Sequence, residues 1–121
     1  MDKRRELGRR GEELAARHLR ALGYLIVGLN IVNQLGELDI VAVDGATVVI
    51  VEVKTRGRPG LAPGLAVNSR KQRKLSQVAA LFLKARRWEN RPARFDVVEV
   101  VCPVSGAPLV NHIKNAFDLA E

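Results

Sequence analysis

Two apolar runs separated by a turn signal most constrain the fold of this chain. Residues 38–43 and 48–53 are rich in Val and Ile, and an Asp-Gly pair at 44–45 lies between them. Two such runs joined through Asp-Gly predict a β-hairpin. Residues 48–51 are apolar on both faces of the second strand, as in a strand that is buried on both sides of a sheet. The sequence therefore predicts a hairpin whose second strand is central in a sheet.

The hairpin carries two carboxylates and one ammonium. Asp39 lies in the first strand, and Glu52 and Lys54 share one face of the second because side chains alternate along a strand. A two-residue loop would set Asp39 opposite Ile50 and diagonal to Glu52. A four-residue loop would make Asp39 and Glu52 direct cross-strand partners, roughly 5 Å apart at Cβ. Both registers place the three charged groups on one sheet face, which is the outline of a metal-dependent phosphodiesterase site.

The alternative interpretation of this cluster is a solvated strand end. A carboxylate and an ammonium near the end of a buried strand are costly, however, unless they are paired or bound to a cation. Two carboxylates this close also raise the pKa of one of them unless positive charge is supplied. A divalent metal ion resolves that conflict, whereas Lys54 alone resolves only part of it.

The distribution of charge indicates a polyanionic partner. The 121 residues carry a net charge of +7. Residues 1–20 hold seven Lys or Arg against four acids, residues 21–52 hold four acids and no Lys or Arg, and residues 53–88 hold ten Lys or Arg and no acid. An acidic centre flanked by basic segments suits a nucleic acid whose phosphates approach a metal. The alternative is a basic surface with no specific partner.

Length and composition narrow the class of protein. A chain of 121 residues that is 47% apolar predicts one soluble globular domain spanning 1–121. The charged N-terminus is not followed by an apolar stretch that could serve as a signal peptide or cross a bilayer. A single cysteine excludes an intramolecular disulfide and a zinc site built from thiolates. We therefore expect a cytoplasmic protein without a membrane partner.

Apolar periodicity and turn signals predict an α-β-β-β-α-β order, with one mixed sheet and helices packed on it. The expected elements are a helix (7–22), a strand (24–29), a polar connection (30–37), the two hairpin strands, a mobile loop (56–67), a helix (69–87) opened by a capping box from Ser69 to Gln72, a strand (95–101) and a short helix or edge element (111–120).

Asp on the second strand and Glu-x-Lys on the third, in this order of elements, resemble the restriction-endonuclease-like PD-(D/E)xK superfamily. The closer resemblance is to the YraN family, small bacterial proteins similar to archaeal Holliday junction resolvases. Where an Arg is expected shortly after Asn30, the chain has Ile-Val-Asn, and Leu38 replaces the superfamily's Pro. The motifs that carry the resemblance span most of the chain: Gly8-Arg9-Arg10-Gly11-Glu12, Ala15, Gly23-Tyr24, Asn30, Gly36-Glu37-Leu38-Asp39, Glu52-Val53-Lys54-Thr55-Arg56, Lys71-Gln72, Arg94-Phe95-Asp96-Val97-Val98, His112 and Asn115-Ala116-Phe117.

The resemblance implies a restriction-endonuclease-like fold and a nuclease that hydrolyses phosphodiester bonds in DNA, in branched or damaged structures, with Mg²⁺ or Mn²⁺. It also implies a homodimer, because resolving a symmetric junction requires two sites. The alternative is a nucleic-acid-binding module that keeps the fold and charge without the chemistry, and a protein-interaction domain is a third interpretation. Two adjacent carboxylates favour the nuclease, since in a pure binding module they would repel phosphate.

Four side chains are the expected catalytic groups. Asp39 and Glu52 would ligate Mg²⁺, which prefers carboxylate oxygens, and the carbonyl of Val53 would supply a third oxygen. Lys54 would position or deprotonate the attacking water or stabilise the developing phosphorane charge, or would simply neutralise Glu52. Glu12 borders the packed face of the first helix and is also the acid that the resemblance assigns there. Its alternative role is that of a surface acid near a helix start.

Further residues are expected around this centre. Glu37 lies two residues before Asp39 on the same face and would support it. Gln72 would contact a phosphate or serve only in the capping box. Asp96 and Arg94 are expected to form a structural ion pair. The expected nucleic-acid contacts all lie in the acid-free segment: Arg56, Arg58, Arg70, Lys71, Gln72, Arg73 and Lys74.

Overall fold

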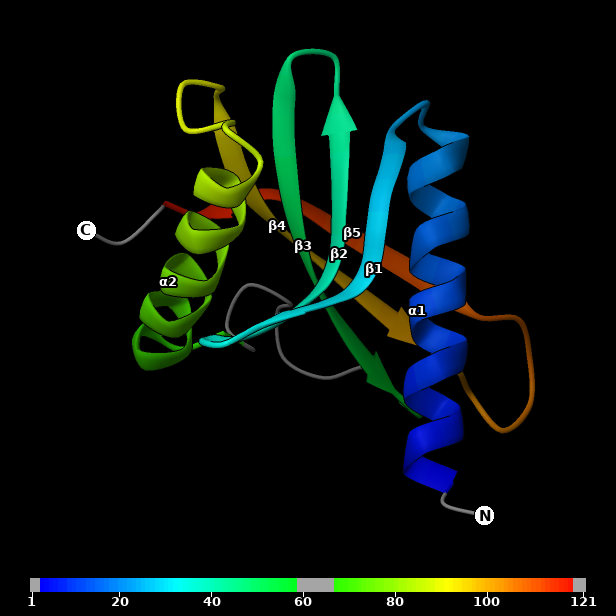
Figure 1. The fold of residues 1–121 in the computed structure, drawn as a ribbon. Helices are drawn as coiled ribbons and strands as arrows, with labels where there is room; N and C mark the ends of the chain where they lie inside the picture. Colours follow the sequence, from blue (N-terminus) through cyan, green and yellow to red (C-terminus); the bar gives the residue numbers. More distant parts are fainter. Residues whose placement is uncertain (1–2, 59–66, 119–121) are drawn as a thin grey trace.

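The computed structural model describes residues 3–58 and 67–118, which form a five-stranded mixed sheet with a helix on each face (Figure 1). The strands lie in the order β1-β2-β3-β4-β5, with β3 and β4 parallel and the other neighbours antiparallel. The predicted α-β-β-β-α-β core is confirmed. Its elements are α1 (Lys3–Ala21), β1 (Leu25–Asn33), β2 (Gly36–Asp44), β3 (Thr47–Arg56), α2 (Ser69–Ala85), β4 (Ala93–Val101) and β5 (Leu109–Phe117).

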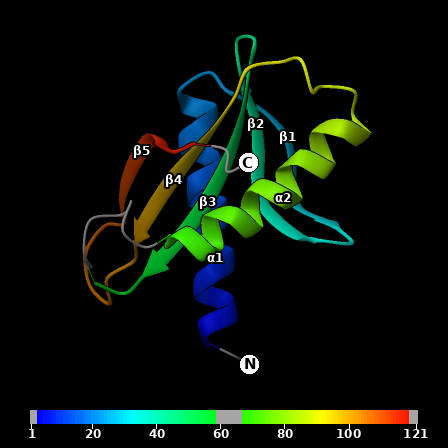
Figure 2. The same ribbon diagram turned by 90° about the vertical axis from the view of Figure 1, so that its left-hand side faces the viewer.

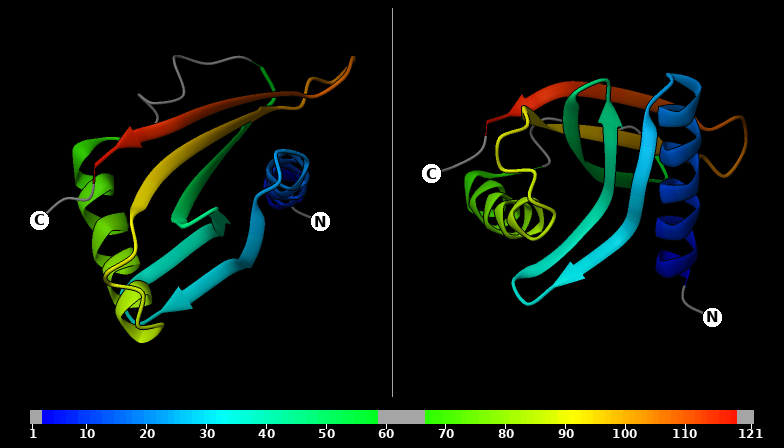
Figure 3. Two further views of the ribbon diagram at one scale, coloured as in Figure 1. Left: turned by 90° about the horizontal axis from the view of Figure 1, so that it is seen from above. Right: turned by 45° about the horizontal axis from the view of Figure 1, so that its top comes forward.

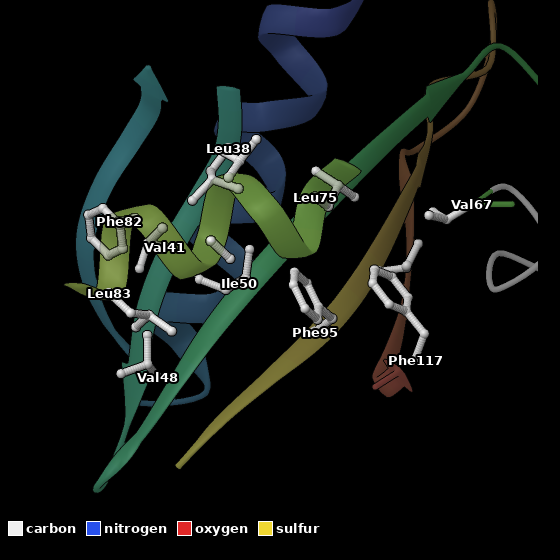
Figure 4. Packing of buried hydrophobic residues seen from close by; sticks show 13 residues of the cluster. Leu38, Val41, Val48, Ile50, Val67, Leu75, Phe82, Leu83, Phe95 and Phe117 are labelled. Atoms are coloured by element: carbon white, nitrogen blue, oxygen red, sulfur yellow. The ribbon is translucent and has the colours of Figure 1, made fainter. Parts of the chain in front are cut away.

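The two helices bury opposite faces of the sheet. In Figure 2, α2 lies in front of the strands and α1 behind them, and the view from above in Figure 3 separates the same three layers. Ala15, Ala16 and Leu19 of α1 pack on one face. The apolar side of α2 packs on the other face, where Figure 4 shows Leu75 and Phe82 directed at the strands.

Strand β3 is central and buried on both faces, as its apolar run predicts. Val48, Val49, Ile50 and Val51 are each no more than 3% exposed. Val49 and Val51 face α1, whereas Val48 and Ile50 belong to the cluster under α2. No helix within residues 3–58 and 67–118 is long and apolar enough to cross a membrane.

The register of the hairpin settles the choice between the two predicted pairings. Asp44 pairs with Thr47 and Ile40 pairs with Val51. This is the register of the four-residue loop, and pairing ends one residue before Asp39 and Glu52. The turn is centred one residue later than the Asp-Gly pair suggested, because Gly45 adopts the left-handed conformation (φ +60°) while the Asp44 carboxylate accepts a hydrogen bond from Arg94 Nη1 at 3.2 Å.

The first strand is longer than predicted. It runs to Asn33 and β2 begins at Gly36, so the polar connection expected at 30–37 is wrong except at residues 34–35. Two tertiary contacts explain the difference: Ile31 packs against the core under α2, and the Asn33 side chain donates to the Val78 carbonyl at 3.1 Å. The strand is irregular in its middle, with a bulge near Gly28 and a left-handed Asn30 (φ 50°).

The remaining differences concern the ends of elements. Helix α1 begins at Lys3, earlier than predicted. The capping box is wrong: Asn68 is the N-cap of α2 and accepts from the Lys71 N–H at 2.9 Å, whereas the Gln72 side chain donates to the Val67 carbonyl. The C-terminal segment is an edge strand, one of the two predicted alternatives. Strand β3 extends to Arg56, and most of the predicted mobile loop lies outside the described residues.

Candidate active site

The candidate site lies where β2 and β3 separate. Pairing between the two strands ends at Ile40 and Val51, while β3 continues beside β4 as far as Arg56. Figure 1 shows β1 and β2 bending away from β3 below this point. The Val53 N–H donates to Oδ2 of Asp39 at 2.9 Å. The fork therefore leaves a backbone donor that fixes the first of the predicted carboxylates.

A cavity of about 420 Å³ opens at this fork, between the first half of α1 and strands β2 and β3. Gly11 permits the close approach of α1, because a Cβ at this position would clash with the Thr55 side chain. That approach brings Glu12 to the cavity, whereas Glu13 is exposed. The lining residues are Arg4, Leu7, Gly8, Glu12, Asp39, Glu52, Val53, Lys54 and Thr55.

Burial and the neighbouring Asp39 destabilise the charge of Glu52. The side chain of Glu52 is hydrogen-bonded to Asp39 and its residue is only 9% exposed. Burial, followed by the hydrogen bond and the negative charge of Asp39, raises the pKa of Glu52 to about 8, although Lys71 and Lys54 oppose the shift. Burial and the nearby Lys71 ammonium lower the pKa of Lys54. The site thus disfavours the ionised forms of both Glu52 and Lys54.

Glu12 belongs to the same electrostatic cluster. Burial raises its pKa, a hydrogen bond with Asn30 partly offsets this, and the negative charges of Asp39 and Glu37 raise it further. Glu37 itself is exposed at the rim, so its influence on the site is through charge rather than through a contact in the cavity. The four predicted catalytic side chains, Glu12, Asp39, Glu52 and Lys54, all line one cavity.

Lys71 is the site residue whose position the sequence did not reveal. We expected it to contact nucleic acid from the surface of α2, but its Nζ lies 3.6 Å from Oε1 of Glu52. The contact joins α2 to β3 across 19 positions of sequence. No spacing rule links these two residues, so only the packing of α2 on the sheet could identify the pair.

Of the other residues predicted to contact nucleic acid, two are held by protein partners and four are exposed. Arg56 forms an ion pair through Nε with Oε2 of Glu99 at 3.1 Å. Gln72 is held by the Val67 carbonyl, which gives it a structural role. The remaining side chains are exposed: Arg58, Arg70, Arg73 and Lys74.

The donor set at the fork fits Mg²⁺. Within residues 3–58 and 67–118, no group of three or more His, Cys, Asp or Glu side chains is placed to hold a metal. Mg²⁺ does not require such a cage, because it keeps several waters and takes one or two carboxylates from the protein. The raised pKa of Glu52 beside Asp39 is the observation that favours a cation, since added positive charge would favour the ionised form of Glu52.

A second polar cluster lies apart from the cavity. Asp96 is fully buried and accepts from Arg94 Nε at 3.0 Å, from the Asn115 N–H at 2.9 Å and from His112 Nε2 at 2.7 Å. The other ring nitrogen of His112 lies 3.0 Å from Nε2 of His18. The expected ion pair between Arg94 and Asp96 is present, and these motif residues join β4, β5 and α1 instead of lining the cavity.

Because the charge of Glu52 is disfavoured in the folded protein, we expect Glu52→Gln to stabilise the protein in metal-free buffer, and the stabilisation should depend on pH. A carboxyl with a folded pKa near 8 and an ordinary value of 4.5 costs stability increasingly as pH rises from about 4.5 to about 8. The quantity to compare is the unfolding free energy of the variant minus that of the unaltered protein. This difference should be larger at pH 9 than at pH 4 by a few kcal/mol, since one pKa unit corresponds to about 1.4 kcal/mol. Urea unfolding in EDTA at both pH values measures this, and a constant difference would contradict it.

Comparison with known proteins places the chain in a family. The model of the uncharacterised protein family UPF0102 matches residues 11–100. A UPF0102 protein of Geobacter sulfurreducens is 47% identical over 115 residues, covering 94% of this chain and 90% of that protein. A UPF0102 protein of Symbiobacterium thermophilum is 46% identical over 114 residues, covering 93% and 97%. The chain therefore belongs to UPF0102, which is the YraN family that its motifs resemble.

Proposed function

We propose that this protein is a Mg²⁺-dependent nuclease, active also with Mn²⁺, that hydrolyses phosphodiester bonds in branched or damaged DNA. One observation carries the proposal: Asp39 and Glu52 meet at the fork of β2 and β3, in a cavity that Lys54 also lines. A half-buried Asp39 beside a buried Glu52 whose negative charge is disfavoured is suited to a divalent cation.

The residues of the fork divide the expected chemistry among them. Asp39, Glu52 and the carbonyl of Val53 would hold the ion, which would polarise the phosphoryl oxygen and supply positive charge to the transition state. Lys54 shares the cavity with both carboxylates, and its lowered pKa favours proton exchange with an attacking water. Asp39 is held in place by the Val53 N–H, so it is oriented before any ligand binds.

Glu12 and Glu37 would adjust the electrostatics of this centre. Glu12 faces the cavity from α1, and its raised pKa suits a group that receives a proton from, or orients, a water molecule. Glu37 adds negative charge near Glu12 and strengthens the attraction of the centre for a cation. For a symmetric branched substrate, paired incision would need two such centres, and we propose a homodimer for that reaction.

Exposed cations at the start of α2 are proposed to bind the DNA backbone. Replacing Arg73 and Lys74 by Gln should weaken binding to all sequences and flatten the log–log dependence of affinity on salt by about one unit per lost phosphate contact. The matched control is Arg17→Gln with Arg20→Gln, since these exposed side chains lie at the far end of α1. An equal loss of slope in both pairs, or no loss in either, would place the footprint elsewhere.

A non-catalytic binding module is the second interpretation, and the carboxylate pair disfavours it. A surface that only holds phosphates gains nothing from two adjacent acids beside it, because they repel the ligand. The scarcity of aromatic residues, 4% of the chain, also disfavours recognition of single strands by stacking and favours contacts with the backbone of duplex or branched DNA.

The decisive experiment is cleavage of a substrate panel. Duplex, single-stranded, flap and four-way-junction DNA of related sequence would be incubated with Mg²⁺, with Mn²⁺ and with EDTA. The proposal expects metal-dependent products that are absent with the Asp39→Ala protein purified in the same way. Binding of these substrates without any cleavage by the unaltered protein would favour the binding module instead.

A further inference from the structure

The ion pair between Lys71 and Glu52 places a protein cation where a metal ion is expected to act. Lys71 Nζ lies 3.6 Å from Oε1 of Glu52, one of the two proposed ligand carboxylates. The Lys71 ammonium also lies close enough to Lys54 to disfavour the charge of Lys54. Glu52 is therefore within reach of two lysine side chains before any metal binds.

The base of the Lys71 side chain is fixed by the start of α2. Its N–H donates to Oδ1 of the N-cap Asn68 at 2.9 Å. The next residue, Gln72, donates to the carbonyl of Val67, which is itself buried. The ammonium, in contrast, is at the end of a flexible four-carbon chain, and the Lys71 side chain is 39% exposed. It can thus leave Glu52 without any change in the helix.

We infer that Lys71 is a counter-cation for Glu52 that a divalent metal displaces, and that the released ammonium then contacts a substrate phosphate. The inference rests on the proposed function. A metal ion on Glu52 would repel the ammonium at this separation. Lys54 is part of β3 and lines the cavity with the carboxylates, whereas Lys71 reaches Glu52 from α2. Metal loading would in this way create a phosphate contact that the metal-free protein lacks.

The inference predicts opposite effects of Lys71→Met on two ligands. Affinity for Mg²⁺ alone, measured by titration calorimetry without DNA, should rise about five- to tenfold because a competing positive charge is removed. Affinity for a four-way junction should change less than twofold in EDTA but fall about five- to tenfold in Ca²⁺, with the DNA checked to be intact after the measurement. Met preserves the length and helix propensity of the side chain.

Arg73→Met is the matched control, because Arg73 is an exposed cation two residues further along the same helix. It should leave the affinity for Mg²⁺ unchanged and should weaken junction binding by the same factor in EDTA and in Ca²⁺. Lys71→Arg keeps the charge and should retain both the weaker metal binding and the metal-dependent DNA contact.

Two results would overturn the inference while leaving the proposed nuclease site intact. One is an unchanged Mg²⁺ affinity of Lys71→Met, and the other is a loss of junction binding that is equal with and without metal. A different result would overturn both proposals: Mg²⁺ binding that is absent from the unaltered protein, or that persists unchanged when Asp39→Asn and Glu52→Gln are combined.

Discussion

Asp39→Asn should lower the rate of DNA cleavage by about 10³-fold or more while the protein stays folded. A carboxylate that holds a catalytic metal supports several kcal/mol of transition-state stabilisation, and 1.4 kcal/mol corresponds to a factor of ten. The amide oxygen of Asn can still accept the hydrogen bond from the Val53 N–H, so the strands at the fork should keep their positions. Single-turnover rates with Mg²⁺, together with a thermal melt of each protein, measure the effect.

Matched substitutions distinguish this loss from a general effect of charge. Glu52→Gln should be as inactive as Asp39→Asn, because both change a proposed ligand. Glu13→Gln removes an exposed acid one residue from Glu12 and should stay within twofold of the unaltered protein. Cleavage that persists at the original rate in both ligand variants would show that the activity belongs to another site or to a contaminant.

The central part of the fold could be read from local patterns. Residues 48–51 are buried on both faces of β3 because an unbroken apolar run has no polar side to expose. The meeting of Asp39 and Glu52 follows from that strand and from the parity of the hairpin, since both candidate registers set them on one face. These predictions depend on contacts between residues close in sequence.

The predictions that were wrong or left open concern features that depend on contacts between residues distant in sequence. Local patterns left two hairpin registers open; in the observed one Asp44 pairs with Thr47, and its carboxylate is held by Arg94, fifty residues away. Strand β1 continues as far as Asn33, whose side chain donates a hydrogen bond to a backbone carbonyl of α2. Asn68 rather than Ser69 caps α2, although both residue types favour this position, so local propensity could not choose between them.

In the candidate site, too, local patterns predict some features, whereas others depend on contacts between distant elements. Glu12 could be separated from Glu13 by the direction of the apolar face of α1, and the structure sets it at the cavity. The ion pair of Lys71 with Glu52 needs the position of α2 over β3, which no periodicity encodes. Likewise, the residues around Asp96 could be recognised as a motif, but not as a buried network joining three elements.

Asp96→Ala should lower the unfolding free energy by about 3–5 kcal/mol, which corresponds to a fall of roughly 10–20 °C in Tm for a chain of this length. Asp96 is fully buried, and its loss would leave Arg94, His112 and the Asn115 N–H without their acceptor. Urea unfolding at neutral pH provides the measurement. The control is Asp44→Ala, which removes a more exposed partner of the same Arg94 and should cost about 1 kcal/mol or less.

The effect of Asp96→Ala should also depend on pH in a definite direction. Burial alone would raise the pKa of Asp96, but hydrogen bonds from His112, Arg94 and the Asn115 N–H outweigh it and hold the pKa below its usual value. The stabilisation by the carboxylate is therefore complete above the unfolded-state pKa of about 3.9 and is lost as pH falls through the lower folded-state value. The difference in stability between the two proteins should thus be constant from pH 5 to 7 and shrink below pH 4. A cost no larger than that of Asp44→Ala, or a difference that grows on acidification, would contradict a structural role for this network.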